Sequence, residues 1–170
     1  MMWTKAHRAD TDCLPLADRH YNRQKVGSPQ FVPPGRCIVL KARGALWVTS
    51  WQFPEYVKHQ WAGAWVNSLF RKECEGIASE YIRAAIAATR YEWPNVPDLG
   101  LVTFIDPKHV RERKVRGRQA IGISYFEAGF KHVGYTKAGL WVMQLLPDEM
   151  PEPSPATGHA MSLFAEEGGQ

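Results

Sequence analysis

The chain is short of cysteine and has no long hydrophobic run, and each shortage excludes a class of protein. Its 170 residues include only three cysteines, Cys13, Cys37 and Cys74, which are far apart and form no CxxC motif. This argues against a disulfide framework and for a reducing compartment. No apolar run approaches the ~18 residues that can span a membrane, and residues 1–12 lack the apolar segment of a signal peptide. We therefore expect a cytoplasmic protein with no membrane partner.

Positive charge is unevenly distributed along the chain. The net charge is only +4, but six of the eleven residues from 108 to 118 are Lys or Arg, against one Glu. The segment that follows residue 147 is acidic instead. Such asymmetry indicates a local anionic partner better than the net charge does. The apolar fraction of 45% is ordinary for a globular protein and sufficient for a substantial core.

The pattern of apolar residues, glycines and prolines predicts a single domain over residues 1–147. The expected elements are a short helix at 14–24, a hairpin of strands 36–41 and 45–51, a strand at 61–70, a long helix at 75–91, a strand at 99–105, a helix at 119–130, and strands at 133–135 and 140–146. This order favours an α/β (or α+β) fold in which a mixed central sheet is flanked by helices. Residues 148–170 are acidic and rich in proline, and we expect a disordered tail there.

The junction between the strand at 61–70 and the helix at 75–91 is a candidate anion site. Amide groups at a helix start have no partner within the helix and carry the positive end of its dipole. The candidate residues are Arg71, Lys72, Gly76, Ala78 and Ser79. Glu73 and Glu75 would oppose an anion, so a helix that binds no ligand is an equally weighted interpretation.

Four further side chains are candidates for chemistry. His20 and Tyr21 precede a loop rich in Gly and Pro; a histidine there can act as a base or bind a metal, although a surface histidine is the simpler interpretation. Asp106 ends a buried strand, where ligands of α/β proteins bind, but it could equally cap the turn with Pro107. Tyr125 is either a core residue or a general acid.

The basic segment is a candidate nucleic-acid interface, because spaced Lys and Arg side chains neutralise phosphates. Its cations are Lys108, Arg111, Arg113, Lys114, Arg116 and Arg118. A solvated charged loop is the alternative. Trp47, Trp51, Trp61 and Trp65 could include a stacking platform for an extruded base, although tryptophans in strands more often belong to the core.

The stretch from Tyr125 to Phe130, followed by Val133 and Gly134, resembles the second half of GNAT-superfamily N-acyltransferases. Within that superfamily the chain resembles the Mom family of bacteriophage DNA modification proteins. This second resemblance covers residues 14–146 and is carried by the runs DRHY (18–21), FVPPG (31–35), FRKE (70–73), VTFID (102–106) and YFEAGF (125–130), in their order and spacing.

The resemblance implies a GNAT-like domain that modifies the exocyclic amine of adenine in double-stranded DNA and so blocks host restriction enzymes, in the host cytoplasm if the chain is phage-encoded. It implies a functional cluster of His20, Tyr21, Asp106 and Tyr125, which some accounts of the family assign to an iron ion. In GNAT enzymes the junction after the central strand cradles the pyrophosphate of acyl-CoA, and a tyrosine at the position of Tyr125 lies beside the donor sulfur. Glu73 and Glu75 depart from that pattern, so the donor is acyl-CoA or a related activated group.

Two other functions remain open at this point. One is an acetyl-CoA-dependent N-acetyltransferase that acts on a protein or a small-molecule amine. The other is a non-catalytic, GNAT-shaped module that binds nucleic acid. A homodimer is also left open.

Overall fold

The computed structural model describes residues 3–20, 23, 25–33, 35–53, 55, 57, 59–108 and 122–157, and the backbone alone of 113–115 and 118–120. The elements are β1 (Thr4–Ala6), a 3-10 turn (Thr11–Cys13), α1 (Leu14–Asp18), β2 (Arg36–Ala42), β3 (Ala45–Trp51), β4 (Trp65–Lys72), α2 (Ala78–Glu92), β5 (Leu101–Ile105), β6 (Arg113–Val115), β7 (Arg118–Ala120), α3 (Ile123–Glu127), β8 (Lys131–Tyr135), β9 (Trp141–Leu145) and a 3-10 turn (Pro147–Glu149).

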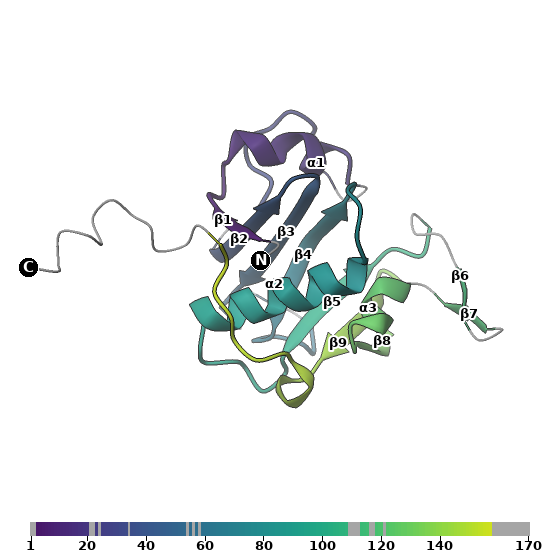
Figure 1. Ribbon diagram of the computed structural model, residues 1–170. Helices are drawn as coiled ribbons and strands as arrows, with labels where there is room; N and C mark the ends of the chain where they lie inside the picture. Colours follow the sequence, from purple (N-terminus) through teal and green to yellow (C-terminus); the bar gives the residue numbers. More distant parts are fainter. Residues whose placement is uncertain are drawn as a thin grey trace, which may run out of the picture.

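Seven strands form one mixed sheet in the order β1-β2-β3-β4-β5-β9-β8 (Figure 1). Every neighbouring pair is antiparallel except β4 and β5, which run parallel. A parallel pair needs a crossover connection, and α2 provides it. The fold is therefore of the α+β class, with a mixed sheet as the sequence predicts. β6 and β7 form a separate two-stranded hairpin.

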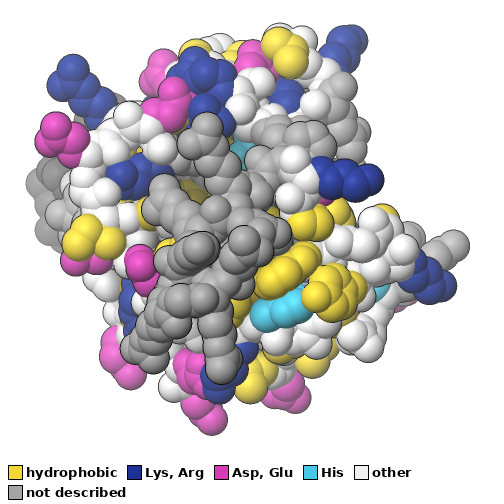
Figure 2. Space-filling view, turned by 90° about the vertical axis from the view of Figure 1, so that its right-hand side faces the viewer, with side chains coloured by type: hydrophobic (Ala, Val, Ile, Leu, Met, Phe, Trp, Pro, Cys, Tyr) yellow, Lys and Arg dark blue, Asp and Glu magenta, His cyan; other side chains and the backbone are white. Residues whose placement is uncertain are grey.

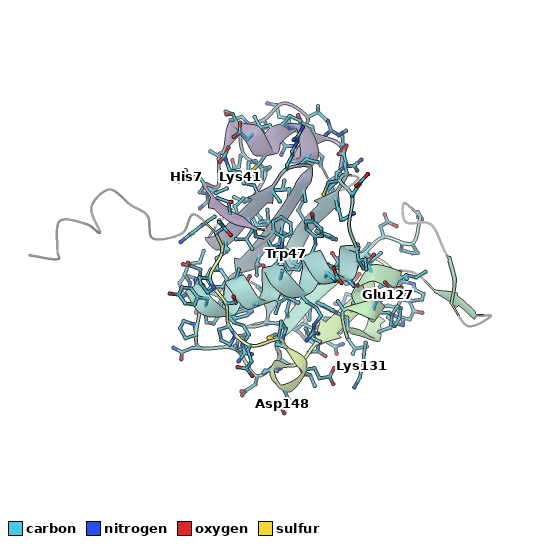
Figure 3. All side chains as sticks on the ribbon, viewed as in Figure 1. His7, Lys41, Trp47, Glu127, Lys131 and Asp148 are labelled. Carbon is cyan, nitrogen blue, oxygen red and sulfur yellow. The ribbon has the colours of Figure 1, made fainter. Side chains whose placement is uncertain are left out.

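The core lies on both faces of the sheet. On one face α2 places Ile82 and Ile86, one helical turn apart, against Trp47, Trp65 and Met143. Trp47 lies near the middle of the sheet behind α2 (Figure 3). On the other face Cys13, Leu16 and Ala17 of the first helical segment, with Phe31 and Val32, cover Val39, Leu46, Val48 and Leu69. A third cluster joins Trp61 and Ala64 to Val102 and Val142.

Most predicted elements are confirmed, with shifted ends. The hairpin is present as β2 and β3, and the long helix begins at Ala78. The helix predicted at 14–24 ends at Asp18. The helix predicted at 119–130 is wrong over its first residues, because 118–120 form β7 and α3 begins only at Ile123. Gly122 has a φ of 71°, a left-handed conformation that cannot belong to a helix.

The folded part extends beyond residue 147, where the predicted domain ended. Met150 is buried, the Arg90 side chain donates to the carbonyl of Pro151 (2.7 Å), and the amide of Ser154 donates to the carbonyl of Ala87 (3.0 Å). Thr157 pairs with Thr4 of β1. Residues 148–157 therefore belong to the domain, and residues 158–170 lie outside the described residues.

Among the helices described, none is long and apolar enough to cross a membrane.

Candidate active site

The parallel pair β4–β5 is hydrogen-bonded over only part of its length. The register joins Trp65, Val66 and Asn67 to Leu101, Val102 and Thr103, and no later residue of either strand belongs to it. β4 continues to Lys72 beside β3, and β5 continues to Ile105 beside β9. Because the ladder ends inside the sheet, the two strands separate at their carboxyl ends, where ligands bind in α/β sheets.

A buried polar cluster marks the point where the ladder ends. The Tyr125 hydroxyl of α3 donates to Asn67 Oδ1 at 2.6 Å, and the Thr103 hydroxyl donates to the Asn67 carbonyl at 3.1 Å. The Asn67 amide donates to the carbonyls of Val48 and Leu69, both at 2.9 Å. These bonds hold an amide that is only 3% exposed, as a buried polar group requires. They fix the Tyr125 phenol at the end of the parallel ladder.

The short helix α3 is held against β5 by a close approach at Gly122. A Cβ atom on Gly122 would lie 2.6 Å from Ile105 Cδ1 and 3.9 Å from the Tyr125 ring. The Tyr125 ring also meets Phe70 and Phe130 edge-on, with centroids 6.3 and 5.3 Å apart. Tyr125 therefore reaches the ladder because glycine allows α3 to begin directly on β5.

Asp106 follows β5 directly and lies at the same end of the sheet as Tyr125. Its Oδ1 accepts the Lys108 amide at 2.9 Å, so the turn-capping role expected from the sequence is confirmed. Its catalytic role stays a prediction.

An ion-pair group ties the end of α1 to the end of β4. The Arg19 guanidinium donates to both carboxylate oxygens of Glu73 (2.9 and 2.7 Å), and Arg71 Nε donates to Glu73 at 2.8 Å. Arg71 also donates to the Arg19 carbonyl at 2.6 Å. Hydrogen bonds from Arg19, and then from Arg71, hold the pKa of the Glu73 carboxyl below its ordinary value.

This tie places His20, which follows Arg19, beside the far end of β4. Arg71 is four residues beyond Asn67, about 13 Å along a strand. Asp106 is three residues beyond Thr103, about 10 Å along β5, and His20 lies next to the end of the neighbouring β4. Tyr21, Arg111 and Arg116 lie outside the described residues. Arg113, Lys114 and Arg118 are described by their backbone in β6 and β7, and Lys108 is exposed.

The predicted donor site is the turn from β4 into α2. Helix α2 has fifteen residues, and its N-cap residue, Ile77, makes no side-chain capping bond, so the first amides, including those of Ala78 and Ser79, are available for an anion. Gly76 has a φ of 104°. Arg71 is engaged by Glu73, and Lys72 donates to the Cys74 carbonyl at 2.5 Å. These two cations therefore stabilise the turn itself.

Among the described residues, no group of three or more His, Cys, Asp or Glu side chains could hold a metal ion. The predicted iron ligands include only two side chains of those types, His20 and Asp106, and the Tyr125 hydroxyl donates to Asn67. The iron assignment to His20, Tyr21, Asp106 and Tyr125 stays a prediction that depends on Tyr21.

The suggested tryptophan platform is wrong for most of its members. Trp47 and Trp65 are fully buried and Trp61 is 6% exposed, while Trp51 packs edge-on against Trp65. Sequence reasoning also missed Asn67 and Thr103. The available signal was an amide in the middle of a mostly apolar strand, WVNSLF, since such a group must find partners when buried.

No protein-family model matches the sequence, and neither the curated proteins nor the solved structures include a significant match.

Proposed function

We propose that this chain is a GNAT-like transferase that modifies the exocyclic amine of adenine in double-stranded DNA. The observation that carries the proposal is the Tyr125 hydroxyl held by Asn67 at the end of the β4–β5 ladder, on the strand that continues to Lys72 and then leads into α2. A central strand followed by an anion-binding turn, with a tyrosine beside it, is the arrangement that the GNAT resemblance implies.

The charges at the turn support binding of a phosphorylated donor. Glu73 is paired with both Arg19 and Arg71, so its charge is compensated and it adds little repulsion. Gly76 leaves the backbone accessible, and the amides of Ala78 and Ser79 lie at the positive end of a long helix. Acyl-CoA, or a related donor, bound there supplies an activated carbonyl.

The remaining steps need one proton donor and one proton acceptor. The target amine forms a bond to the donor carbonyl carbon and loses a proton, and the bond to the leaving thiolate breaks. Tyr125 can give its hydroxyl proton to that thiolate once the hydroxyl turns away from Asn67 Oδ1, its acceptor in this structure. Asp106, at the same end of β5, or His20 can accept the proton of the amine. No step requires a metal.

The DNA part of the proposal rests on charge. The insertion between Asp106 and Gly122 carries the six cations of residues 108–118, and its described backbone forms the β6–β7 hairpin, which extends away from the domain on the side that carries α3 (Figure 1). Cations on a hairpin that extends from the α3 side of the domain would neutralise phosphates of a bound duplex.

The test is mass analysis of nucleosides from cells that express the protein. DNA from cells with the wild-type chain should contain a modified deoxyadenosine, and DNA from cells with Tyr125→Phe should contain far less at equal protein abundance. Tyr91→Phe, at an exposed position at the end of α2, is the matched control and should behave as wild type. Unmodified DNA in every sample would overturn the proposal.

The same cultures separate the two alternatives. Binding of acetyl-CoA with no affinity for DNA would favour an acetyltransferase of protein or small-molecule amines. DNA binding that depends on Arg111 and Arg113, with unmodified nucleosides throughout, would favour a non-catalytic module.

A further inference from the structure

An exposed aromatic surface lies at the edge of the sheet formed by β8 and β9. The His132 and Trp141 rings are stacked, with centroids 4.0 Å apart and planes 17° apart. Tyr135 meets both rings edge-on, at 4.9 and 6.0 Å. We call these three side chains the aromatic platform.

A β-bulge creates the platform. His132 pairs with Met143, but Gly134 pairs with Val142, so Val133 is an extra residue in β8. A bulge reverses the alternation of side chains in one strand. It therefore puts Tyr135, the partner of Trp141, on the same face as His132. Without the extra residue, His132 and Tyr135 would point to opposite faces of the sheet.

The platform adjoins the candidate active site. Trp141 is the register partner of Ile105, the residue that precedes Asp106 and contacts Gly122 at the start of α3. Lys108, two residues after Asp106, begins the basic segment. The end of β5 is thus connected to the platform, through the pairing of Ile105 with Trp141, and to Asp106 and Lys108.

The platform is accessible to a partner, unlike most of the other tryptophans. Tyr135 is 59% exposed, and His132 and Trp141 are half-buried. Figure 2 shows hydrophobic side chains gathered with a histidine on the side of the domain that carries α3 and β8. Exposed aromatic side chains next to cations are the combination that binds nucleic acid strands, because rings stack on bases while cations neutralise phosphates.

We propose that His132, Tyr135 and Trp141 form the surface on which an unpaired base of the DNA substrate stacks. The inference rests on the proposed function, since an exocyclic amine inside a duplex is accessible only after its base leaves the helix. Charge complementarity favours a nucleic acid over an apolar protein segment as occupant. Lys108, at the start of the insertion, and Lys137, two residues beyond Tyr135, are exposed cations in the segments that adjoin the platform.

The test compares two labelled single-stranded DNA oligonucleotides in anisotropy titrations with the full chain. One strand carries all its bases, and the other has the same phosphates but abasic central residues. Wild type should bind the base-bearing strand about tenfold more tightly than the abasic strand. Tyr135→Ala should lose most of this preference, while Tyr135→Phe, which keeps the ring, and the exposed control Tyr91→Ala should retain it.

An unchanged preference in Tyr135→Ala would overturn the platform. So would conversion of a wild-type dimer into a monomer by Tyr135→Ala with the base preference intact, because the surface would then join two copies of the chain. The nucleoside analysis keeps the two proposals distinguishable. Modified deoxyadenosine with a preference independent of Tyr135 refutes the platform alone, whereas a preference that requires Tyr135 without modified nucleosides refutes the transferase alone.

Discussion

The two ends of the β4–β5 pair are built from opposite kinds of side chain. At the amino end Trp65 is fully buried and packs against the rings of Trp51 and Trp93. At the carboxyl end the buried Asn67 and the half-buried Tyr125 share a hydrogen bond. Apolar packing of that kind stabilises a fold, whereas buried polar groups cost free energy unless they are bonded. The difference suggests that the amino end secures the sheet and the carboxyl end carries the chemistry.

The largest effect should come from removing the Tyr125 hydroxyl. Tyr125→Phe should lower DNA modification by about 100- to 10,000-fold, the usual contribution of a general acid. The free energy of unfolding should change by only about 1 kcal/mol, because one hydrogen bond is lost. Rates of modified-nucleoside formation and urea unfolding measure the two quantities. Equal activity in wild type and variant would remove the functional distinction between the two ends.

At the amino end of the pair, a substitution should reduce stability strongly. Trp65→Ala should lower the free energy of unfolding by about 3–5 kcal/mol, because it leaves a large cavity under α2. Urea unfolding is the measurement, and the exposed Tyr91→Ala is the control, with an expected change within about 0.5 kcal/mol. A loss below about 1 kcal/mol for Trp65→Ala would mean that this end does not secure the sheet.

Asn67 should contribute to stability through its hydrogen bonds with Tyr125 and with the neighbouring backbone. Asn67→Ala should cost about 2 kcal/mol, because the buried carbonyls of Val48 and Leu69 lose their donor. A double-mutant cycle with Tyr125→Phe should give an interaction energy of about 1 kcal/mol, since the two side chains share a bond. Strict additivity of the two free-energy losses would show that the bond contributes nothing in solution.

The smallest effect should come from the Glu73 ion pairs. The pKa of Glu73 is below its ordinary value of 4.5, so its contribution to stability is complete above that value and is lost as the pH falls through the lower pKa of the folded state. Glu73→Gln should therefore lower the Tm slightly at pH 7. The Tm difference between variant and wild type should shrink as the pH falls below about 4, where the Glu73 carboxyl of the wild type becomes protonated. A Tm difference that stays constant from pH 7 to acid would contradict the pairing.

The sequence predicts the frame of the fold well because its signals are local. The β2–β3 hairpin and α2 follow from strand residues around a glycine turn and from apolar residues at helical spacing. The helix at 119–130 was overextended because a left-handed glycine at 122 looks like any other glycine in sequence. The composition of residues 148–157 predicts a disordered tail, although their backbone contacts α2 and β1.

The candidate site is less predictable because it depends on contacts between distant elements. Tyr125 and Asp106 were identified as candidates, but their common support, the buried Asn67 on β4, was not. The aromatic platform could not be predicted either, because a bulge at Val133 decides which side chains share a face. The four tryptophans that looked suitable mostly fill the core instead.

One assay tests the central claim directly: release of free thiol from acetyl-CoA by the purified chain, with and without double-stranded DNA. We predict thiol release that needs DNA and that falls by about 100-fold or more in Tyr125→Phe, which loses its proton donor. A rate of thiol release that is equal in Tyr125→Phe and wild type, or that is the same with and without DNA, would contradict a DNA-modifying centre at the carboxyl end of the β4–β5 pair.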